Sequence, residues 1–372
     1  MQTDYFQSKA LTRDYASICA TTIPVLDIMV ARRSWRKYTE WEMEKKFKDE
    51  FEAFIQKSAA IRQCDLADLT LITDLSQLEY LFKTAYKGVI GKINPWLPKS
   101  KAAGMLVLAI DKSKKEVDRP LGYAYPTLVG QDAVLWLTEK GIGSVWLAGI
   151  NGLELAKAMG LPSEKWIFAI IVFGKTGKKP KGFNFDNISY QVVSKKRKKL
   201  PEISRLNRIE IDFPINSTES PNLNLPKQDI TNTLDMLNAW KTAAPGPSIR
   251  LIELEMMIEG GRIAPSACNK QPWQFVAIND ENELKEMARL LNEPEIPKGM
   301  IACLGESGTV YEVGLERPFW LIDVPIAMSN ISVMAGALGR SVKVYFDIPE
   351  KQINSRMKLK GNWRTAGIIG IK

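Results

Sequence analysis

The sequence predicts an α+β fold made of two degenerate copies of one unit, fused end to end. Length is the first observation, because 372 residues suggest two units at about 150 residues per domain. The second is the coarse order of elements in each half, namely helix, helix, strand, helix, strand, long helix and strand, which departs from the steady alternation of a parallel α/β sheet. The third is an internal repeat far longer than a solenoid period.

The repeat is clearest near the end of each half, where a predicted helix and a glycine precede a terminal strand. The helices end at Gly141 and Gly339, 198 positions apart, and the strands begin at Trp166 and Trp363, 197 positions apart. Two elements at nearly one offset favour a duplication over unrelated segments that share only strand–helix punctuation.

Weaker matches extend the repeat upstream. Residues 71–74 predict a strand that runs into a helix, and residues 277–280 match them at an offset of 206. At the front of each copy, Ser34-Trp35-Arg36 is similar to Ser248-Ile249-Arg250. The matches predict that both copies share one order of elements.

The same comparison gives the expected domain boundaries. We expect a first half at residues 1–200, a linker at 201–230 and a second half at 231–372. The chain from about residue 176 to 230 is rich in Lys, Pro, Asn and Ser and has few periodic apolar residues. Such a composition is typical of a connection that lies on the surface or links two domains.

Composition excludes several kinds of chemistry. The chain has no histidine, which removes the Ser-His-Asp triad, the Cys-His pair and every imidazole metal site. Its four cysteines have no close pairing or metal spacing, so we expect free thiols, a reducing compartment and no metal. The net charge of +9 fits a phosphorylated small molecule or, less specifically, nucleic acid.

We expect no membrane-spanning segment and no secretory signal. The longest nearly uncharged apolar run that we identify, residues 166–174, is far shorter than the about 20 residues of a membrane helix and predicts a buried strand. Acidic Asp4 and Asp14 precede any apolar stretch, and the basic start and cleavage site of a secretory signal are missing. We therefore expect a cytoplasmic protein with no membrane partner.

A basic segment follows the first apolar helix. Arg32, Arg33, Ser34 and Arg36 lie within five residues, and three guanidiniums with a hydroxyl can converge on one phosphate. Taken alone, the same residues fit a solvated basic helix end.

A second segment, residues 258–276, combines a helix, a polar turn and a strand. The turn Pro265-Ser-Ala-Cys-Asn269 precedes Pro272-Trp273, which leads into an alternating strand. This turn offers Ser and Asn side chains and free backbone groups to the edge of a heterocycle. A helix-to-strand turn beside a buried tryptophan is the alternative interpretation.

Together these segments resemble the FMN-dependent nitroreductase family. Its members begin with an Arg-x-Ser-x-Arg/Lys element that grips the FMN phosphate and ribityl chain. Later they carry Pro-Ser-x-x-Asn-x-Gln-Pro-Trp, which contacts the same flavin from the other subunit of a dimer. The resemblance implies FMN contacts from Arg32, Arg33, Ser34 and Arg36 and from Pro265, Ser266, Ala267 and Asn269.

Two further segments fit the same resemblance. Residues 141–150 resemble the strand-like turn that passes the reactive edge of the flavin, which implies that Leu147, Ala148 and Gly149 line it. A backbone amide there is a reasonable partner for N5, and no catalytic side chain is identified, because the cofactor carries the hydride chemistry.

The basic run at residues 195–199 matches the place where family members direct a basic residue to FMN. The resemblance implies Arg197 and Lys199, whose charge can stabilise the anion at N1–C2=O of reduced flavin. A solvated or RNA-attracting run is the alternative for any single lysine.

The motifs are divided between the copies. At an offset of 206 the partner of the polar turn is residues 59–63, which lack its chemistry, and the partner of Arg32-Arg33-Ser34 is Gly246-Pro247-Ser248, which lacks both arginines. In ordinary family members a symmetric dimer forms two composite sites. We therefore expect a monomer that acts as an internal pseudo-dimer with one complete FMN site.

The resemblance implies an FMN-dependent NAD(P)H oxidoreductase with a ping-pong mechanism. Its acceptor would be a nitroaromatic, a quinone or another electron-poor small molecule, and nucleic acid is not an expected partner. Ala148 stands where many members have an acidic or glycine residue, and Asp65-Leu66-Ala67 has lost Gln-Pro-Trp, so the acceptor stays open. A non-catalytic FMN-binding sensor or storage protein and a basic nucleic-acid-binding protein remain alternatives.

Overall fold

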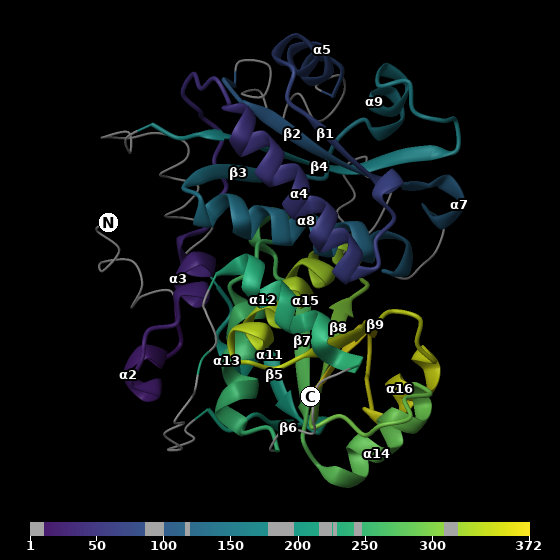
Figure 1. The fold of residues 1–372 in the computed structure, drawn as a ribbon. Helices are drawn as coiled ribbons and strands as arrows, with labels where there is room; N and C mark the ends of the chain where they lie inside the picture. The colour runs from purple at the N-terminus through teal and green to yellow at the C-terminus, as the bar shows by residue number, and fades with distance from the viewer. Residues whose placement is uncertain are drawn as a thin grey trace. The chain divides into compact units, whose positions relative to one another are not determined.

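The computed structural model describes residues 11–85, 100–115, 120–177, 197–215, 225, 229–241, 248–308 and 319–372. These residues divide into two compact units. The four-stranded unit contains the described residues from Arg32 to residue 177, and the six-stranded unit contains residues 11–31 and those from Arg197 onward. Figure 1 labels the elements of both units.

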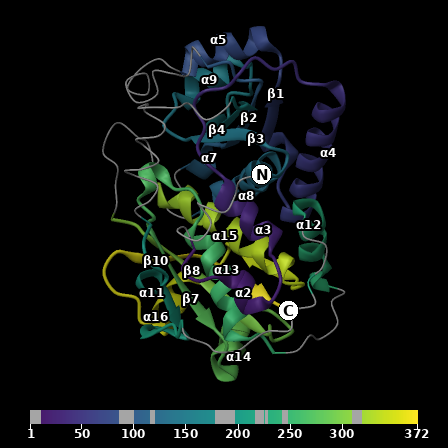
Figure 2. The same cartoon turned by 90° about the vertical axis from the view of Figure 1, so that its left-hand side faces the viewer.

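The four-stranded unit is an antiparallel sheet between two layers of helices. Its strands follow the order β1-β2-β4-β3, with α5 and α9 over one face and α4 and α8 over the other (Figures 1 and 2). The elements are α4 (Lys45–Arg62), η1 (Leu66–Asp68), β1 (Leu69–Ile72), α5 (Leu75–Ala85), β2 (Gly104–Asp111), α7 (Lys112–Lys115), α8 (Leu121–Glu139), β3 (Ile142–Leu147), α9 (Gly152–Ala158) and β4 (Lys165–Lys175).

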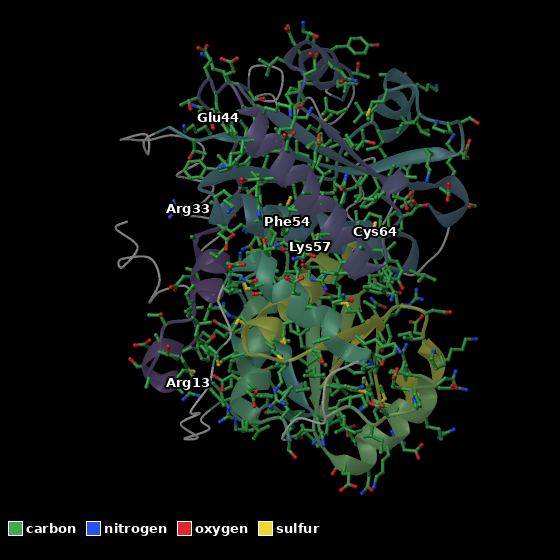
Figure 3. The ribbon with its side chains drawn as sticks, in the orientation of Figure 1. Arg13, Arg33, Glu44, Phe54, Lys57 and Cys64 are labelled. Carbon is green, nitrogen blue, oxygen red and sulfur yellow. The ribbon has the colours of Figure 1, made fainter. Side chains whose placement is uncertain are left out.

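Burial on both faces explains why β2 and β4 read as continuous apolar runs. Every residue of β4 between its two terminal lysines is buried. On the side of α4 and α8, Trp136 stacks on Phe51 and Phe54 at centroid distances of 5.1 and 5.4 Å. Such aromatic pairs add about 0.5–1.5 kcal/mol beyond the area they bury. Phe54, Lys57 and Cys64 mark the course of the chain along and beyond α4 in Figure 3.

The six-stranded unit extends the same plan by two strands, in the order β6-β5-β7-β8-β10-β9. Strand β5 runs parallel to β7, and the other pairs are antiparallel. The elements are α2 (Tyr15–Cys19), α3 (Pro24–Ala31), α11 (Leu200–Ile203), β5 (Ser204–Leu206), β6 (Arg208–Asp212), α12 (Ile230–Asn238), η4 (Ala239–Lys241), α13 (Leu251–Arg262), η5 (Ala267–Asn269), β7 (Trp273–Ile278), α14 (Glu281–Leu290), β8 (Gly299–Glu306), α15 (Trp320–Ala337), β9 (Val342–Tyr345), α16 (Glu350–Arg356) and β10 (Trp363–Ile371).

Local irregularities recur in both units. Helices α8 and α15 each carry a proline at their sixth residue, Pro126 and Pro325. The last strand of each unit holds one extra residue against its neighbour, Phe168 in β4 and Ala366 in β10. Because bulges and helix-interior prolines are specific local features, their repetition together with the shared strand order β1-β2-β4-β3 and β7-β8-β10-β9 confirms an α+β fold in two copies.

Three expectations about the elements need correction. The predicted order omitted a strand and a short helix before the last strand of each unit, namely β3 and α9 in one and β9 and α16 in the other. Part of the expected linker is structured, because Ile203 of α11 is fully buried and β5 joins the sheet beside β7. Residues 11–31 belong to the six-stranded unit, where α3 packs on α15. The ranges of the compact units therefore differ from the expected halves.

The longest apolar stretch is also not the expected one. Residues 166–174 do lie in a buried strand, β4, but α15 is a longer apolar helix with a mean hydropathy of 1.3. Among the described residues it is the one helix long and apolar enough to cross a membrane, and it is completely buried inside the fold. A core helix has the same composition. The four cysteines are free thiols, as expected.

Candidate functional site

The basic segment of the four-stranded unit lies alongside β3. Ser34 forms a parallel bridge with Ser144, and the Trp35 N–H donates to the Ser144 carbonyl at 3.0 Å. The Tyr38 hydroxyl donates to the carbonyls of Trp35 and Val172 at 2.7 and 3.1 Å. Arg33, labelled in Figure 3, precedes this anchored stretch. The bonds fix the backbone that carries the predicted phosphate-binding residues.

This pairing brings two predicted groups together. Strand β3 continues from Ser144 to Leu147, so the predicted turn at residues 147–149 begins three residues beyond the contact with Ser34. A Cβ on Gly143 would lie 2.8 Å from the Trp35 ring, closer than real Cβ contacts. Only a glycine at this position lets Trp35 approach β3. That requirement was a signal in the sequence that we did not use.

In the six-stranded unit, the polar turn is tightly wound between α13 and β7. Cys268, Asn269 and Gln271 have φ values of 47°, 55° and 52°, a left-handed region that costs L-residues about 1–2 kcal/mol each. The Ser266 hydroxyl accepts a hydrogen bond from the backbone N–H of Gln271 at 2.9 Å. The side-chain amide of Gln271 donates to the backbone carbonyl of Asn269 at 3.0 Å. These side-chain bonds offset the cost of the conformation.

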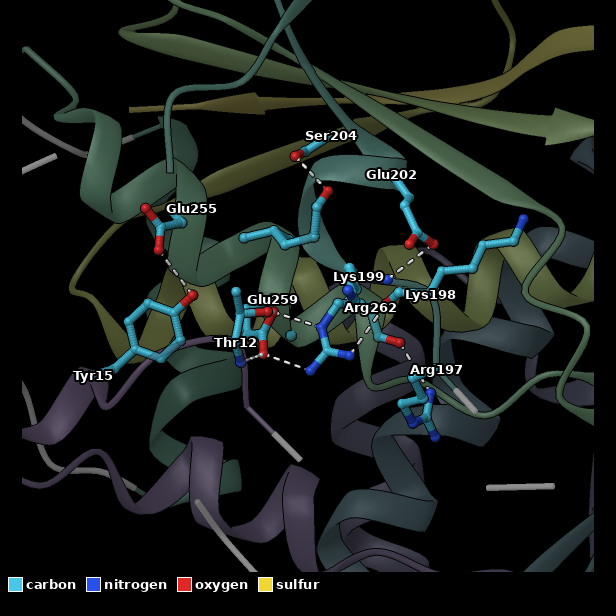
Figure 4. Close-up of polar contacts among 12 residues, drawn as sticks. Thr12, Tyr15, Arg197, Lys198, Lys199, Glu202, Ser204, Glu255, Glu259 and Arg262 are labelled. Atoms are coloured by element: carbon cyan, nitrogen blue, oxygen red, sulfur yellow. Dashed lines mark hydrogen bonds and ion pairs between the residues drawn. The ribbon is translucent and has the colours of Figure 1, made fainter. Parts of the chain in front are cut away.

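One of the two predicted basic residues, Arg197, contacts the residues that lead into the same turn. Arg197 Nη1 donates to the carbonyl of Arg262 at 2.9 Å (Figure 4) and to that of Ala264 at 2.8 Å. The Lys198 N–H donates to Gln271 Oε1 at 2.8 Å. Arg197 thus stabilises the end of α13 and the start of the turn. The side chain of Lys199 is exposed.

A buried carboxyl that the sequence analysis missed also holds the turn. The Ala267 N–H donates to both carboxyl oxygens of Asp323, at 3.0 and 3.1 Å. Asp323 lies in the first turn of α15 and is 3% exposed. Burial raises the pKa of Asp323 to about 8, although the hydrogen bond from Ala267 opposes the shift. The sequence feature that could have indicated it is that Asp323 is the one charged residue of a largely apolar helix.

Helix α13, which leads into the turn, carries further buried acids. Glu255 accepts from the Tyr15 hydroxyl at 3.0 Å, and Glu259 forms a two-point ion pair with Arg262 at 2.7 Å for both contacts. Glu259 also accepts from the Thr12 N–H at 2.8 Å (Figure 4). Burial raises the pKa of Glu255. The N-terminal segment and the polar turn therefore share α13 as a common support.

The predicted residues divide into two groups, one in each unit. The group in the four-stranded unit is Arg32, Arg33, Ser34, Arg36, Leu147, Ala148 and Gly149, and the group in the six-stranded unit is Arg197, Lys199, Pro265, Ser266, Ala267 and Asn269. Each group contains basic residues and a turn that adjoins a strand.

Two of the matches between copies were wrong in position. Residues 59–62 belong to α4, so the counterpart of the polar turn is the shorter connection from Gln63 to Asp68, where the Asp65 side chain accepts the Ala67 N–H at 2.9 Å. Arg250 caps α13 and bonds Glu253 at 3.1 Å, whereas Ser34 lies beside β3. The fixed offset between the copies gave the wrong counterparts because it assumes that corresponding segments have the same length.

The two copies of the fold define a tandem α+β protein of the nitroreductase type. The family model described as "Putative TM nitroreductase" matches residues 24–218, and the one described as "Nitroreductase family" matches residues 241–299. The chain belongs to the nitroreductase family.

Individual relatives are distant. The "Putative NADH dehydrogenase/NAD(P)H nitroreductase" of Archaeoglobus fulgidus is 28% identical over 91 residues, which are 23% of this chain and 50% of the relative, so the chain spans half the length of this relative. A solved "putative nitroreductase" from Thermotoga maritima aligns over 93% of this chain and 92% of its own, with 16% identity and a TM-score of 0.40. An "FMN-dependent Nitroreductase" from Clostridium difficile aligns over 44% and 93%, with 22% identity and a TM-score of 0.31.

Proposed function

We propose that the protein is an FMN-dependent NAD(P)H oxidoreductase that reduces nitroaromatics, quinones or similar electron-poor acceptors by ping-pong exchange. One observation carries the proposal, namely the asymmetry between the two helix-to-strand connections. In the six-stranded unit, Ser266 and Asn269 lie in a wound turn fixed by side-chain bonds. In the four-stranded unit, the connection from Gln63 to Asp68 is shorter, lacks counterparts of Ser266 and Asn269, and has a single residue with positive φ, Gln63.

The donors in each unit fit different parts of FMN. Arg32, Arg33 and Arg36 offer fork-shaped donors suited to phosphate oxygens, and Ser34 adds an exposed hydroxyl. We assign the phosphate and ribityl end to these residues. Leu147, at the end of the neighbouring strand β3, and Ala148 and Gly149 directly after it would line the reactive edge of the ring.

The turn of the six-stranded unit would hold the rim of the ring. Ser266 and Asn269 supply polar groups there, and Pro265 fixes the entry of the chain. Ala267 would contribute through its methyl group, because its N–H is bound by Asp323 and its carbonyl accepts the Lys270 N–H. Lys199 supplies positive charge beside the turn, and Arg197 organises the turn through backbone carbonyls.

The chain's residues bind and orient, whereas bound FMN supplies hydride acceptance from NAD(P)H and electron delivery to the acceptor. No side chain in either group has to exchange a proton with the substrate. We infer that the two halves act as an internal pseudo-dimer with one flavin per chain.

Visible absorption and a flavin titration test the proposal. Purified protein should be yellow, bind one FMN per chain and oxidise NAD(P)H when a nitroaromatic or quinone is added. Flavin that binds but is not reduced by NAD(P)H would support a sensor or storage protein. A colourless preparation that takes up no FMN, and binds RNA or DNA in a salt-dependent way, would overturn the flavin assignment.

A further inference from the structure

The polar turn depends on one carboxyl from a distant part of the chain. Asp323 and Ala267 are separated by 56 positions, yet the Ala267 N–H lies within 3.1 Å of both oxygens of the carboxyl. A backbone donor shared by two oxygens matches the symmetric charge of a carboxylate. A neutral acid presents one carbonyl oxygen and one hydroxyl, and the hydroxyl then needs an acceptor of its own.

Asp323 has no ion-pair partner among the described residues. The elements packed against α15 carry the charged side chains Asp27 (α3), Asp235 (α12), Glu253, Glu255, Glu259 and Arg262 (α13), Glu306 (β8), Lys343 (β9) and Arg364 (β10). None of these makes a described bond to Asp323. Arg262 pairs with Glu259, and Arg364 pairs with Glu350. The Ala267 amide is thus its one described polar contact outside its own helix.

An isolated buried acid is costly to a fold, so its position has to be explained. Leucine branches at Cγ in the same way and, although larger, would suit the apolar residues of the helix. The bond to Ala267 gives Asp323 a role that leucine cannot fill, because the turn holds three non-glycine residues with positive φ. A turn under such conformational cost needs anchors outside itself.

We propose that Asp323 is a positioning residue, whose ionised carboxylate anchors the Ala267 amide and so fixes the Ser266–Gln271 turn in the conformation that receives the flavin. The proposal deepens the function proposed above and rests on it for the identity of the ligand. The anchoring itself concerns only the six-stranded unit and can be tested without flavin.

Ionisation strengthens this anchor. Hydrogen bonds to a charged acceptor are roughly twice as strong as neutral ones. Because the pKa of Asp323 is raised to about 8, its ionisation occurs within the pH range in which the protein can be studied. The turn should therefore tighten as the pH rises from 6.5 to 9.

Amide hydrogen exchange on the flavin-free protein tests the anchor directly. In wild-type protein the protection of Ala267, normalised to the intrinsic exchange rate at each pH, should rise about tenfold from pH 6.5 to pH 9. Asp323→Asn keeps an acceptor without a charge and should show a flat profile. Asp323→Leu should lose protection at every pH. Wild-type protection that persists in Asp323→Leu, or a wild-type profile as flat as that of Asp323→Asn, overturns the proposal.

Flavin binding gives the second readout. Asp323→Leu should bind FMN about tenfold more weakly at pH 8.5 while its thermal midpoint stays the same or rises, since apolar replacements of buried charges are often stabilising. Glu350→Gln is a matched control, because Glu350 is a buried acid of the same unit that pairs with Arg364. Equal FMN affinity in wild type and Asp323→Leu would overturn the role in flavin binding. If wild-type protein binds no FMN but exchange at Ala267 follows Asp323, the proposed function fails and the anchor stands.

Discussion

Arg62 and Asp132 form a two-point ion pair inside the four-stranded unit, with Nε to Oδ2 and Nη2 to Oδ1 both at 2.8 Å. Both side chains are at most 3% exposed, and Ser58 donates a further bond to Asp132 at 2.8 Å. The pair joins the end of α4 to the middle of α8 and so fixes the connection that leads into β1.

Removing one partner should destabilise this unit strongly. Arg62→Leu leaves the Asp132 carboxylate buried without its cation, which costs about 3–5 kcal/mol. The double variant Arg62→Leu/Asp132→Leu should recover most of that loss. Denaturant unfolding measures both free energies. A single variant as stable as wild type would show that the pair contributes little.

The phosphate-binding prediction has a direct test. Arg32→Ala should raise the Kd for FMN at least tenfold, because a charge-assisted phosphate contact is lost. Arg250 is unsuitable as the control, since it caps α13 and pairs with Glu253. Arg289→Ala is a better one, because Arg289 is 69% exposed and pairs only with Glu286 on its own helix. Equal losses in a fluorescence titration would contradict a phosphate contact from Arg32.

Gly143 should be required for the contact between Trp35 and β3. The methyl group of Gly143→Ala would meet the Trp35 ring at 2.8 Å and Thr176 at 2.3 Å, so the basic segment must shift. We expect a cost of about 1–3 kcal/mol, as for overpacked sites, and weaker FMN binding. Gly141→Ala is the matched control, because it has a positive φ of 73° and no neighbour within 4 Å. That variant should lose stability but keep its FMN affinity.

Ionisation of Asp323 should lower global stability even though it strengthens the local bond to Ala267. Its pKa in the folded chain, about 8, is raised above the ordinary value of 3.8. The stabilisation of the protonated form is therefore complete below about pH 4 and is lost as the pH rises toward 8. The stability of wild type relative to Asp323→Asn should fall across this range, by at most about 1.4 kcal/mol per pH unit. Parallel curves from urea unfolding at several pH values would contradict the raised pKa.

Some features of the fold and the site could be predicted from the sequence and others could not. Trp166 and Trp363 correctly indicated the terminal strands β4 and β10, and residues 265–269 correctly indicated a turn. These features are predictable because the structural preferences of Pro, Gly and Trp act within a few residues of the sequence. Strand β5 was missed because its pairing with β7 depends on a distant segment. Asp323 was missed for the same reason, since nothing next to it in sequence indicates that its carboxyl meets Ala267.

Cysteine labelling can locate the flavin on the polar turn. Cys268 is exposed and lies in the middle of the turn, Cys64 is half-buried, and Cys19 and Cys303 are buried. Burial also raises the pKa of the Cys19 and Cys303 thiols, which lowers their thiolate fraction and reactivity. A maleimide should therefore modify Cys268 first and Cys64 more slowly, as mass spectrometry of the digested protein can show. Bound FMN should slow the reaction of Cys268 several-fold and leave Cys64 unchanged. If saturating FMN leaves the rate at Cys268 as it was, the isoalloxazine ring does not lie over residues 265–269.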